Sequence, residues 1–260
     1  MLQNAFGDIA AIAMFIAAVA ASEIGYLLGK RLRGRASNAD AFAAIQSAMF
    51  PILGLLLAFT FSLALSRFDA RRNAVVNEAN AISTAVARAD VLDPADRRSL
   101  HSQLRAYTQV RIQFVEAASD QQAQDAATAE SLDFQRAMWA IGTRAASSDA
   151  RPQLISLLLQ SLNDVVDASA LEAAAAEAHI PDAILAILFA IAALTVGVAG
   201  FNAGLRGGRS TAFAMYALVL ALVSTAIIDL DRPQTGWTRV SLVPLQDVVW
   251  SVEDPQKPVR

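Results

Sequence analysis

The stretch FAAIQSAMFPILGLLLAFTFSLAL occupies residues 42–65 and contains no charged side chain. About 20 consecutive apolar residues are enough for an α-helix to cross the hydrocarbon core of a bilayer. Three more stretches of similar length and composition lie at residues 9–29, 184–205 and 211–230. The sequence therefore predicts an all-α membrane protein with four transmembrane helices.

The composition of the chain agrees with this prediction. Of the 260 residues, 55% are hydrophobic and 17% are charged, and the mean hydropathy is +0.40. Soluble domains usually carry about 25% charged residues. The deficit is confined to the four apolar stretches, so a soluble region must lie between them. The net charge of −3 argues against a nucleic-acid binder, and the lack of cysteine excludes disulfides and thiolate chemistry.

The first apolar stretch is predicted to be a retained span rather than a signal peptide. A signal peptide begins with a basic region, but the preceding segment MLQNAFGD has no lysine or arginine. The basic residues follow the stretch instead, at Lys30, Arg31, Arg33 and Arg35. This order marks a helix whose C-terminal end faces the cytoplasm.

The short loops predict the orientation of the chain. Short loops rich in lysine and arginine stay in the cytoplasm. The second such loop carries Arg206 and Arg209 and lies on the same side as the first. This places both termini and residues 67–181 outside the cytoplasm. Arg67, Arg71 and Arg72, directly after the second span, oppose this assignment.

Residues 67–181 are predicted to be helical throughout. The first helix continues from the second span, and Asp93 with Pro94 is a favourable helix start. Pro181 marks the end of the last helix before the third span. Four amphipathic helices of this length favour an antiparallel four-helix bundle. Their apolar positions recur every three or four residues: Leu100, Leu104, Tyr107, Val110 and Phe114; Phe134, Met138, Ile141 and Ala145; Leu154, Leu158, Leu162 and Val165.

The predicted organisation has four parts. Residues 1–66 hold spans 1 and 2 with their basic loop, 67–181 the bundle, 182–231 spans 3 and 4, and 232–260 a tail. In the tail, TRVSLVPL favours a short extended segment and VEDPQKPVR favours disorder.

Glu23 is an ionisable residue within the first span. Such a group is costly unless it pairs, faces water or reaches the interface. Its place near the cytoplasmic end allows pairing with Lys30 or Arg31. The alternative is a proton or ion site.

Small residues are spaced four apart in the second span, at Gly54, Ala58, Ser62 and Ser66. This spacing lets helix backbones approach closely. The stripe is either a packing face within the chain, a subunit interface or a pore lining. Similar glycine pairs occur at Gly25 and Gly29 and at Gly200 and Gly204.

Two polar clusters follow spans that leave the membrane on the same side. One comprises Arg67, Arg71, Arg72 and Glu78, and the other comprises Asp229, Asp231 and Arg232. We expect them to meet as a salt-bridge collar at the membrane face, or alternatively as an ion-binding or gating ring. A DxD sequence alone lacks the further acidic ligands that calcium requires.

No enzyme active site is predicted. The chain has no glycine-rich phosphate loop, no HExxH and no GxSxG. Its two histidines, His101 and His179, are far apart and have no ligand-like neighbours. We therefore expect no metal and no cofactor.

Two segments together carry a family resemblance. They are LLAFTFSLALSRFDARRNAVVNEANAISTAVARADVL, after the middle of the second span, and DLDRPQTG, after the fourth. From about residue 50 to 242 the chain resembles a bestrophin-like family of bacterial integral membrane proteins. Resemblance to a bacterial membrane-protein family implies a location in the bacterial inner membrane. Kinship with bestrophins, which are pentameric anion channels, implies four spans and a large helical region between spans 2 and 3. It also implies a pore lined by the second span, with an apolar neck near Phe59 and Phe61.

The resemblance and the charge rule disagree on orientation. Bestrophins hold their large inter-span region in the cytoplasm, whereas the short basic loops place it in the periplasm. Two functions remain open. One is a homo-oligomeric ion channel, and the other is a non-conducting sensor or scaffold whose helical bundle binds a protein partner or a ligand.

Overall fold

The computed structural model describes residues 5–33, 39–117, 120–148, 151–208, 212–232 and 237–253. The regular secondary structure within these ranges is helical, and a short 3₁₀ turn, Ala89–Val91, follows α2. The helices are α1 (Ala5–Arg31), α2 (Ala39–Arg88), α3 (Pro94–Glu116), α4 (Gln121–Ser148), α5 (Pro152–Glu177), α6 (Asp182–Arg206), α7 (Ala212–Asp231) and α8 (Val243–Glu253).

Four helical segments of the described chain are long and apolar enough to cross a membrane. They lie in α1, α2, α6 and α7, at the four predicted stretches. α2 is 50 residues long, more than twice the roughly 20 residues that a span requires. Its apolar part is therefore the predicted span, and its polar C-terminal part continues beyond it.

The chain divides into two compact units. The membrane unit comprises residues 1–67 and 179–238, and the helical unit comprises residues 68–178 and 239–260.

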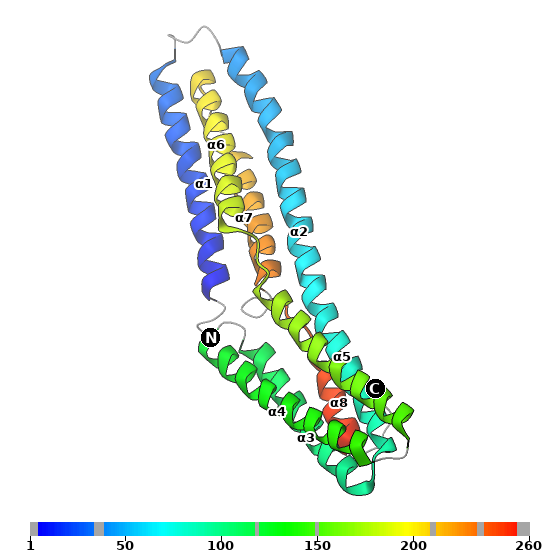
Figure 1. The fold of residues 1–260 in the computed structure, drawn as a ribbon. Helices are drawn as coiled ribbons and strands as arrows, with labels where there is room; N and C mark the ends of the chain where they lie inside the picture. Colours follow the sequence, from blue (N-terminus) through cyan, green and yellow to red (C-terminus); the bar gives the residue numbers. More distant parts are fainter. Residues whose placement is uncertain are drawn as a thin grey trace. The chain divides into compact units, whose positions relative to one another are not determined.

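In the membrane unit, α1 packs closely along α6 (Figure 1). A methyl group on Gly25 would overlap the carbonyl oxygen of Gly197, and one on Gly200 would overlap that of Ser22. Gly29 and Gly204 are enclosed in the same way, by Phe201 and Tyr26. Only glycine allows this backbone separation, so these glycines fix the seam between α1 and α6.

The span of α2 packs on the same unit through one face. Phe42 and Phe50 make edge-on ring contacts with Phe201 of α6 and Tyr216 of α7. Leu53 is buried in an apolar cluster that also contains Leu220 of α7.

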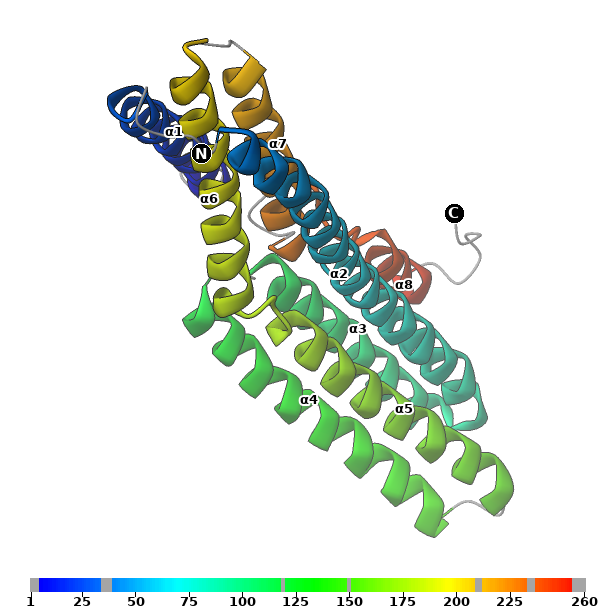
Figure 2. The same cartoon turned by 90° about the horizontal axis from the view of Figure 1, so that it is seen from above.

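In the helical unit, α3, α4 and α5 lie side by side with the C-terminal part of α2 (Figure 2). They share one apolar core, to which each predicted amphipathic stripe contributes. Members include Ile82, Leu104, Met138 and Leu158. Asp93 caps α3 as predicted, because its Oδ1 accepts hydrogen bonds from the backbone N–H groups of Ala95 and Asp96.

The expectation of an extended segment in the tail was partly wrong. The chain is non-helical only as far as Leu242, and α8 then begins at Val243. Pro244 suits a first helical turn, since its missing N–H has no intrahelical partner there. Leu245 and Val248 on one face of α8 join the core of the helical unit. The segment from residue 254 onward, predicted to be disordered, lies outside the described residues.

Candidate functional site

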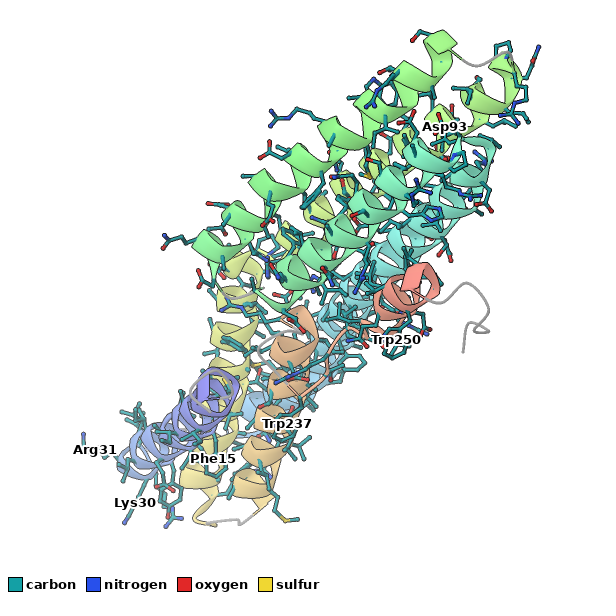
Figure 3. All side chains as sticks on the ribbon, turned by 90° about the horizontal axis from the view of Figure 1, so that it is seen from below. Phe15, Lys30, Arg31, Asp93, Trp237 and Trp250 are labelled. Atoms are coloured by element: carbon teal, nitrogen blue, oxygen red, sulfur yellow. The ribbon has the colours of Figure 1, made fainter. Side chains whose placement is uncertain are left out.

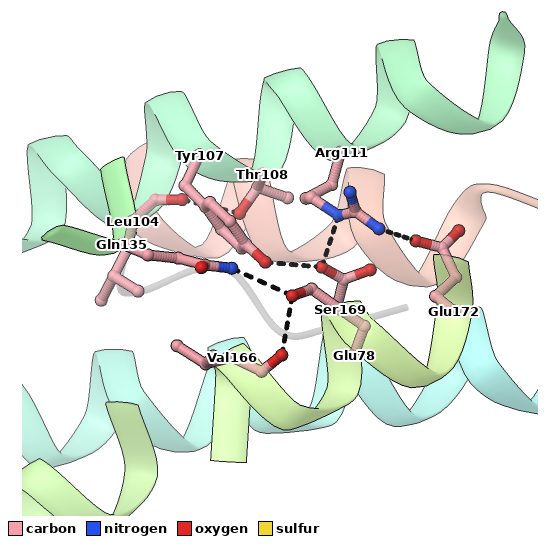
Figure 4. Close-up of polar contacts among 9 residues, drawn as sticks. All are labelled: Glu78, Leu104, Tyr107, Thr108, Arg111, Gln135, Val166, Ser169 and Glu172. Carbon is pink, nitrogen blue, oxygen red and sulfur yellow. Dashed lines mark hydrogen bonds and ion pairs between the residues drawn. The ribbon is translucent and has the colours of Figure 1, made fainter. Parts of the chain in front are cut away.

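Three charged side chains meet in the core of the helical unit (Figure 4). Nε of Arg111 on α3 donates to Oε1 of Glu78 on α2 over 2.7 Å. The hydroxyl of Tyr107, one turn earlier on α3, donates to the same oxygen over 2.8 Å. Nη2 of Arg111 donates to Oε2 of Glu172 on α5. All four side chains are buried, with Glu78 and Tyr107 fully shielded from solvent.

Further contacts fix the cluster in place. The Arg111 guanidinium carbon lies 4.4 Å from the ring centroid of Phe114, a cation–π distance. On the other side, Nε2 of Gln135 on α4 donates to the hydroxyl of Ser169 on α5 over 2.9 Å. Polar contacts in this core therefore involve all four principal helices of the unit, which also share the apolar core.

The charges of this cluster do not balance if every group is ionised. Two carboxylates, Glu78 and Glu172, face a single guanidinium, Arg111. Burial raises the pKa of Glu172 well above its usual range, and the nearby Glu78 carboxylate adds to this shift. Although burial alone lowers the pKa of Arg111, the two carboxylates raise it overall. Arg111 is thus the permanent charge of the cluster.

Sequence analysis found only part of this site. Tyr107 was predicted as a core residue and Glu78 as a polar one, but Arg111 and Glu172 were missed. A signal was present, because Ser169 and Glu172 continue the apolar stripe of Leu158, Leu162 and Val165 at the same spacing. A polar residue on a core-facing stripe predicts a buried partner.

The acidic members of the predicted collar contact backbone groups of the membrane unit. Oδ1 of the buried Asp231 accepts a hydrogen bond from the N–H of Ile180 over 2.9 Å. Asp229 accepts from the N–H groups of Trp237 and Thr238. Both aspartates therefore hold chain segments against the end of α7.

The basic members of the predicted collar are placed differently from one another. Arg71 is buried and donates to the carbonyl oxygens of Ala175 and Ala178 at the end of α5, where a cation is favoured by the helix dipole. Arg67 is half-buried, and Arg72 and Arg232 are exposed. A collar that joins these residues to Asp229 and Asp231 remains a prediction.

The four residues of the α2 stripe, Gly54, Ala58, Ser62 and Ser66, are all exposed. A methyl group on Gly54 would meet no atom within 4 Å. By helical geometry, Ser62 lies about 180° around α2 from the buried Leu53. The stripe thus faces away from the helices with which α2 packs in the membrane unit.

The remaining predicted polar residues lie near the ends of spans. Glu23 is half-buried within α1 and interacts with a neighbouring group. Lys30 and Arg31 project from the C-terminal end of α1 (Figure 3), and Nε of Arg33 lies 3.4 Å from the Leu205 carbonyl oxygen. Arg35 and Arg209 lie outside the described residues. Among the residues that the structure describes, no three His, Asp or Glu side chains are grouped as a metal site.

Comparison with known proteins gives the family and the fold. A bacterial bestrophin homologue from Klebsiella pneumoniae superposes with a TM-score of 0.67 and 16% identity, over 96% of this chain and 99% of that chain. A membrane protein variant gives a TM-score of 0.69 at 16% identity, with the same coverage of 96% and 99%. A substituted form of the Klebsiella pneumoniae homologue gives 0.63 at 17% identity, over 95% and 96%.

At these identities the solved structures establish a shared fold alone. No curated protein matches the chain by sequence. The bestrophin-like domain, however, matches residues 16–245, which is most of the chain. The chain therefore belongs to the bestrophin-like family of membrane proteins.

Proposed function

We propose that this chain is one subunit of a homo-oligomeric ion channel of the bacterial inner membrane, with α2 lining the pore. The exposed hydroxyl groups of the α2 span are the observation that carries this proposal. Ser47 and Ser62 are exposed there, whereas Thr195 of α6 and Ser224 of α7 are buried. A hydroxyl facing lipid has no partner beyond its own helix, so exposed hydroxyls favour contact with water or with another subunit.

The rest of the surface of α2 fits the same proposal. Phe59 is 65% exposed and Phe61 is 39% exposed. Because the two lie about 160° apart around α2, only one of them faces the pore in this proposal and forms its apolar neck. The other spans expose mostly large apolar side chains to lipid, such as Ile187 on α6 and Met215 on α7. In this proposal the helical unit is an antiparallel four-helix bundle inserted between spans 2 and 3.

The first test is the subunit count in a mild detergent, measured by light scattering on the purified full chain. A closed ring of subunits is expected, as in the bestrophins. A stable monomer would contradict the channel, because four spans are too few to enclose a central pore. The variant Ser62→Leu should reduce the assembly, and Met215→Leu on the lipid-facing surface should not.

The second test uses the absence of cysteine from the chain. A single cysteine at Ser62 should react with a charged, membrane-impermeant thiol reagent, and the reaction should block ion flux into liposomes. A single cysteine at Met215 is the matched control, because this position is also exposed in the subunit but should face lipid. Equal labelling at both positions would contradict a pore at α2.

The same cysteine approach tests orientation. We propose a periplasmic helical unit, on the basis of the basic short loops. A cysteine at the exposed Glu130 should then be labelled from outside intact cells, and one at the exposed Lys30 should not. The reverse pattern would place the unit in the cytoplasm.

A second candidate function is that of a non-conducting sensor or scaffold. It is favoured by an open apolar groove between α4 and α5 in the helical unit, lined by residues that include Leu132, Trp139 and Val166. Leu132 is 49% exposed and Trp139 is 44% exposed. Flux through liposomes that contain only this purified protein would count against this candidate.

A further inference from the structure

The second carboxylate oxygen of Glu78 has no hydrogen-bond partner although it is fully buried. Its sister oxygen, Oε1, already accepts from Arg111 and Tyr107. A buried charged acceptor without a hydrogen-bond donor is strongly unfavourable. Oε2 of Glu78 therefore needs a hydrogen-bond donor from a neighbouring group.

The Glu172 carboxyl group is the neighbour that can supply this donor. It binds the same guanidinium as Glu78, because Arg111 donates to both carboxyl groups, and the unpartnered oxygen of Glu78 lies on the side of Glu172 (Figure 4). Two ionised carboxylates on one guanidinium repel each other, and neither can donate a hydrogen bond. If one of them holds a proton, that proton forms a hydrogen bond between them.

The surrounding charges favour a single proton. The charged groups that act most strongly on Glu172 are Arg111 on α3 and Glu78 on α2. The neutral Tyr107 on α3 donates to Glu78. α4 contributes the neutral Gln135. Arg71, two turns from Glu78 on α2, is engaged by the carbonyl oxygens at the end of α5. One guanidinium and two carboxylates therefore become neutral when one proton is added.

We propose that Glu78 and Glu172 form a proton-binding site, in which one proton is shared between the two carboxyl groups and Arg111 neutralises the remaining charge. The site lies in the helical unit, and the proposal does not rest on a pore lined by the span of α2. Its ligand is a proton taken from solvent, and both carboxyl oxygens that receive it are buried in the core of the helical unit. Release of the proton leaves an unbalanced negative charge there.

The test is the infrared spectrum of the purified full chain in D₂O, with ¹³C at the glutamate carboxyl groups. The label shifts glutamate bands and leaves aspartate bands in place. The measurement uses a Glu23→Gln background, which removes the glutamate within the first span. A neutral carboxylic acid band from glutamate is expected at pH 7 and should disappear as the pH is raised.

Single substitutions test whether the neutral carboxylic acid band comes from Glu78 and Glu172. Glu78→Gln and Glu172→Gln should each abolish the band, and Glu130→Gln, at an exposed position on α4, should retain it. Absence of the band at pH 7 in the Glu23→Gln background would overturn the proposal even if the other variants fail to fold. Persistence of the band in both folded pair variants would overturn it as well.

Discussion

The two compact units of this chain are held together by different means. In the membrane unit, glycines bring the backbones of α1 and α6 into direct contact. In the helical unit, large apolar side chains separate the backbones and enclose a charged cluster. Within a bilayer, lipid is as apolar as leucine, so close packing must supply the attraction between helices. Outside it, burial of apolar surface is sufficient and can offset the cost of buried charges.

The largest expected effect is on the helical unit. Arg111→Met removes the guanidinium that bridges Glu78 and Glu172, and loss of one partner from a buried ion pair costs about 3–5 kcal/mol. Hydrogen exchange measured by mass spectrometry should then increase across α3 and α5 and stay unchanged in α1. Arg136→Met, at an exposed ion pair with Asp133, is the matched control. Equal changes in both variants would mean that the cluster is not important for stability.

The next effect is on the membrane unit. Gly200→Leu forces a side chain into the backbone of α1 at Ser22, and overpacking of this kind costs about 1–3 kcal/mol. Exchange should increase in α1 and α6 and not in α3. Gly54→Leu on the open face of α2 should leave the fold of the subunit intact. If Gly54→Leu destabilised α1 as strongly as Gly200→Leu, the distinction between the exposed α2 stripe and the seam of α1 and α6 would be wrong.

A smaller effect is the pH dependence of the stability of the helical unit. Because the pKa of Glu172 is raised in the folded protein, its contribution to stability is complete below the ordinary glutamate pKa. This contribution is lost as the pH rises toward the raised value, by about tenfold in the unfolding equilibrium constant per pH unit. The free energy of unfolding of α3 and α5 should decline from pH 5 to pH 9. Hydrogen exchange in these two helices during denaturant unfolding measures this decline. Glu172→Gln should flatten it, and a decline that is unchanged in this variant would assign it to another group.

The smallest effect is a pH dependence at the start of α3, where stability is lost as the pH falls rather than as it rises. The N–H groups of Asp96 and Ala95 lower the pKa of Asp93, so its contribution is present above the ordinary aspartate pKa and is lost in acid. Asp93→Asn retains a capping oxygen and should remove this acid sensitivity from the first turn of α3. The acid sensitivity is measured by NMR as the hydrogen-exchange rates of the backbone N–H groups of Ala95 and Asp96. An unchanged acid response would exclude Asp93 as its source.

Local signals were sufficient to predict much of the fold. The spans follow from the length of the apolar runs, the start of α3 from Asp93 and Pro94, and the break before α6 from Pro181. The helix α8 was missed because its apolar face is short, with Leu245 and Val248 as its buried members. Its stability comes from packing on α3, which a local pattern cannot reveal.

The candidate site was less predictable because it is made by tertiary contacts. Glu78, Arg111 and Glu172 lie on three helices, and no spacing along the chain joins them. The same limit applies to the stripe at Gly54, since its spacing resembles that of the Gly200 and Gly204 pair. Only the structure distinguishes the glycines that face a neighbouring backbone from the one that faces open space.

The seam between α1 and α6 also has a consequence for biosynthesis. About 150 residues separate the end of α1 from the start of α6. At a synthesis rate of about 5–20 residues per second, synthesis of α6 begins roughly 8–30 seconds after that of α1 is complete. During that time the face with Gly25 and Gly29 is open to other helices in the bilayer, including those of neighbouring nascent copies. Correct pairing therefore depends on α1 remaining inserted and unpaired until the ribosome has delivered α6.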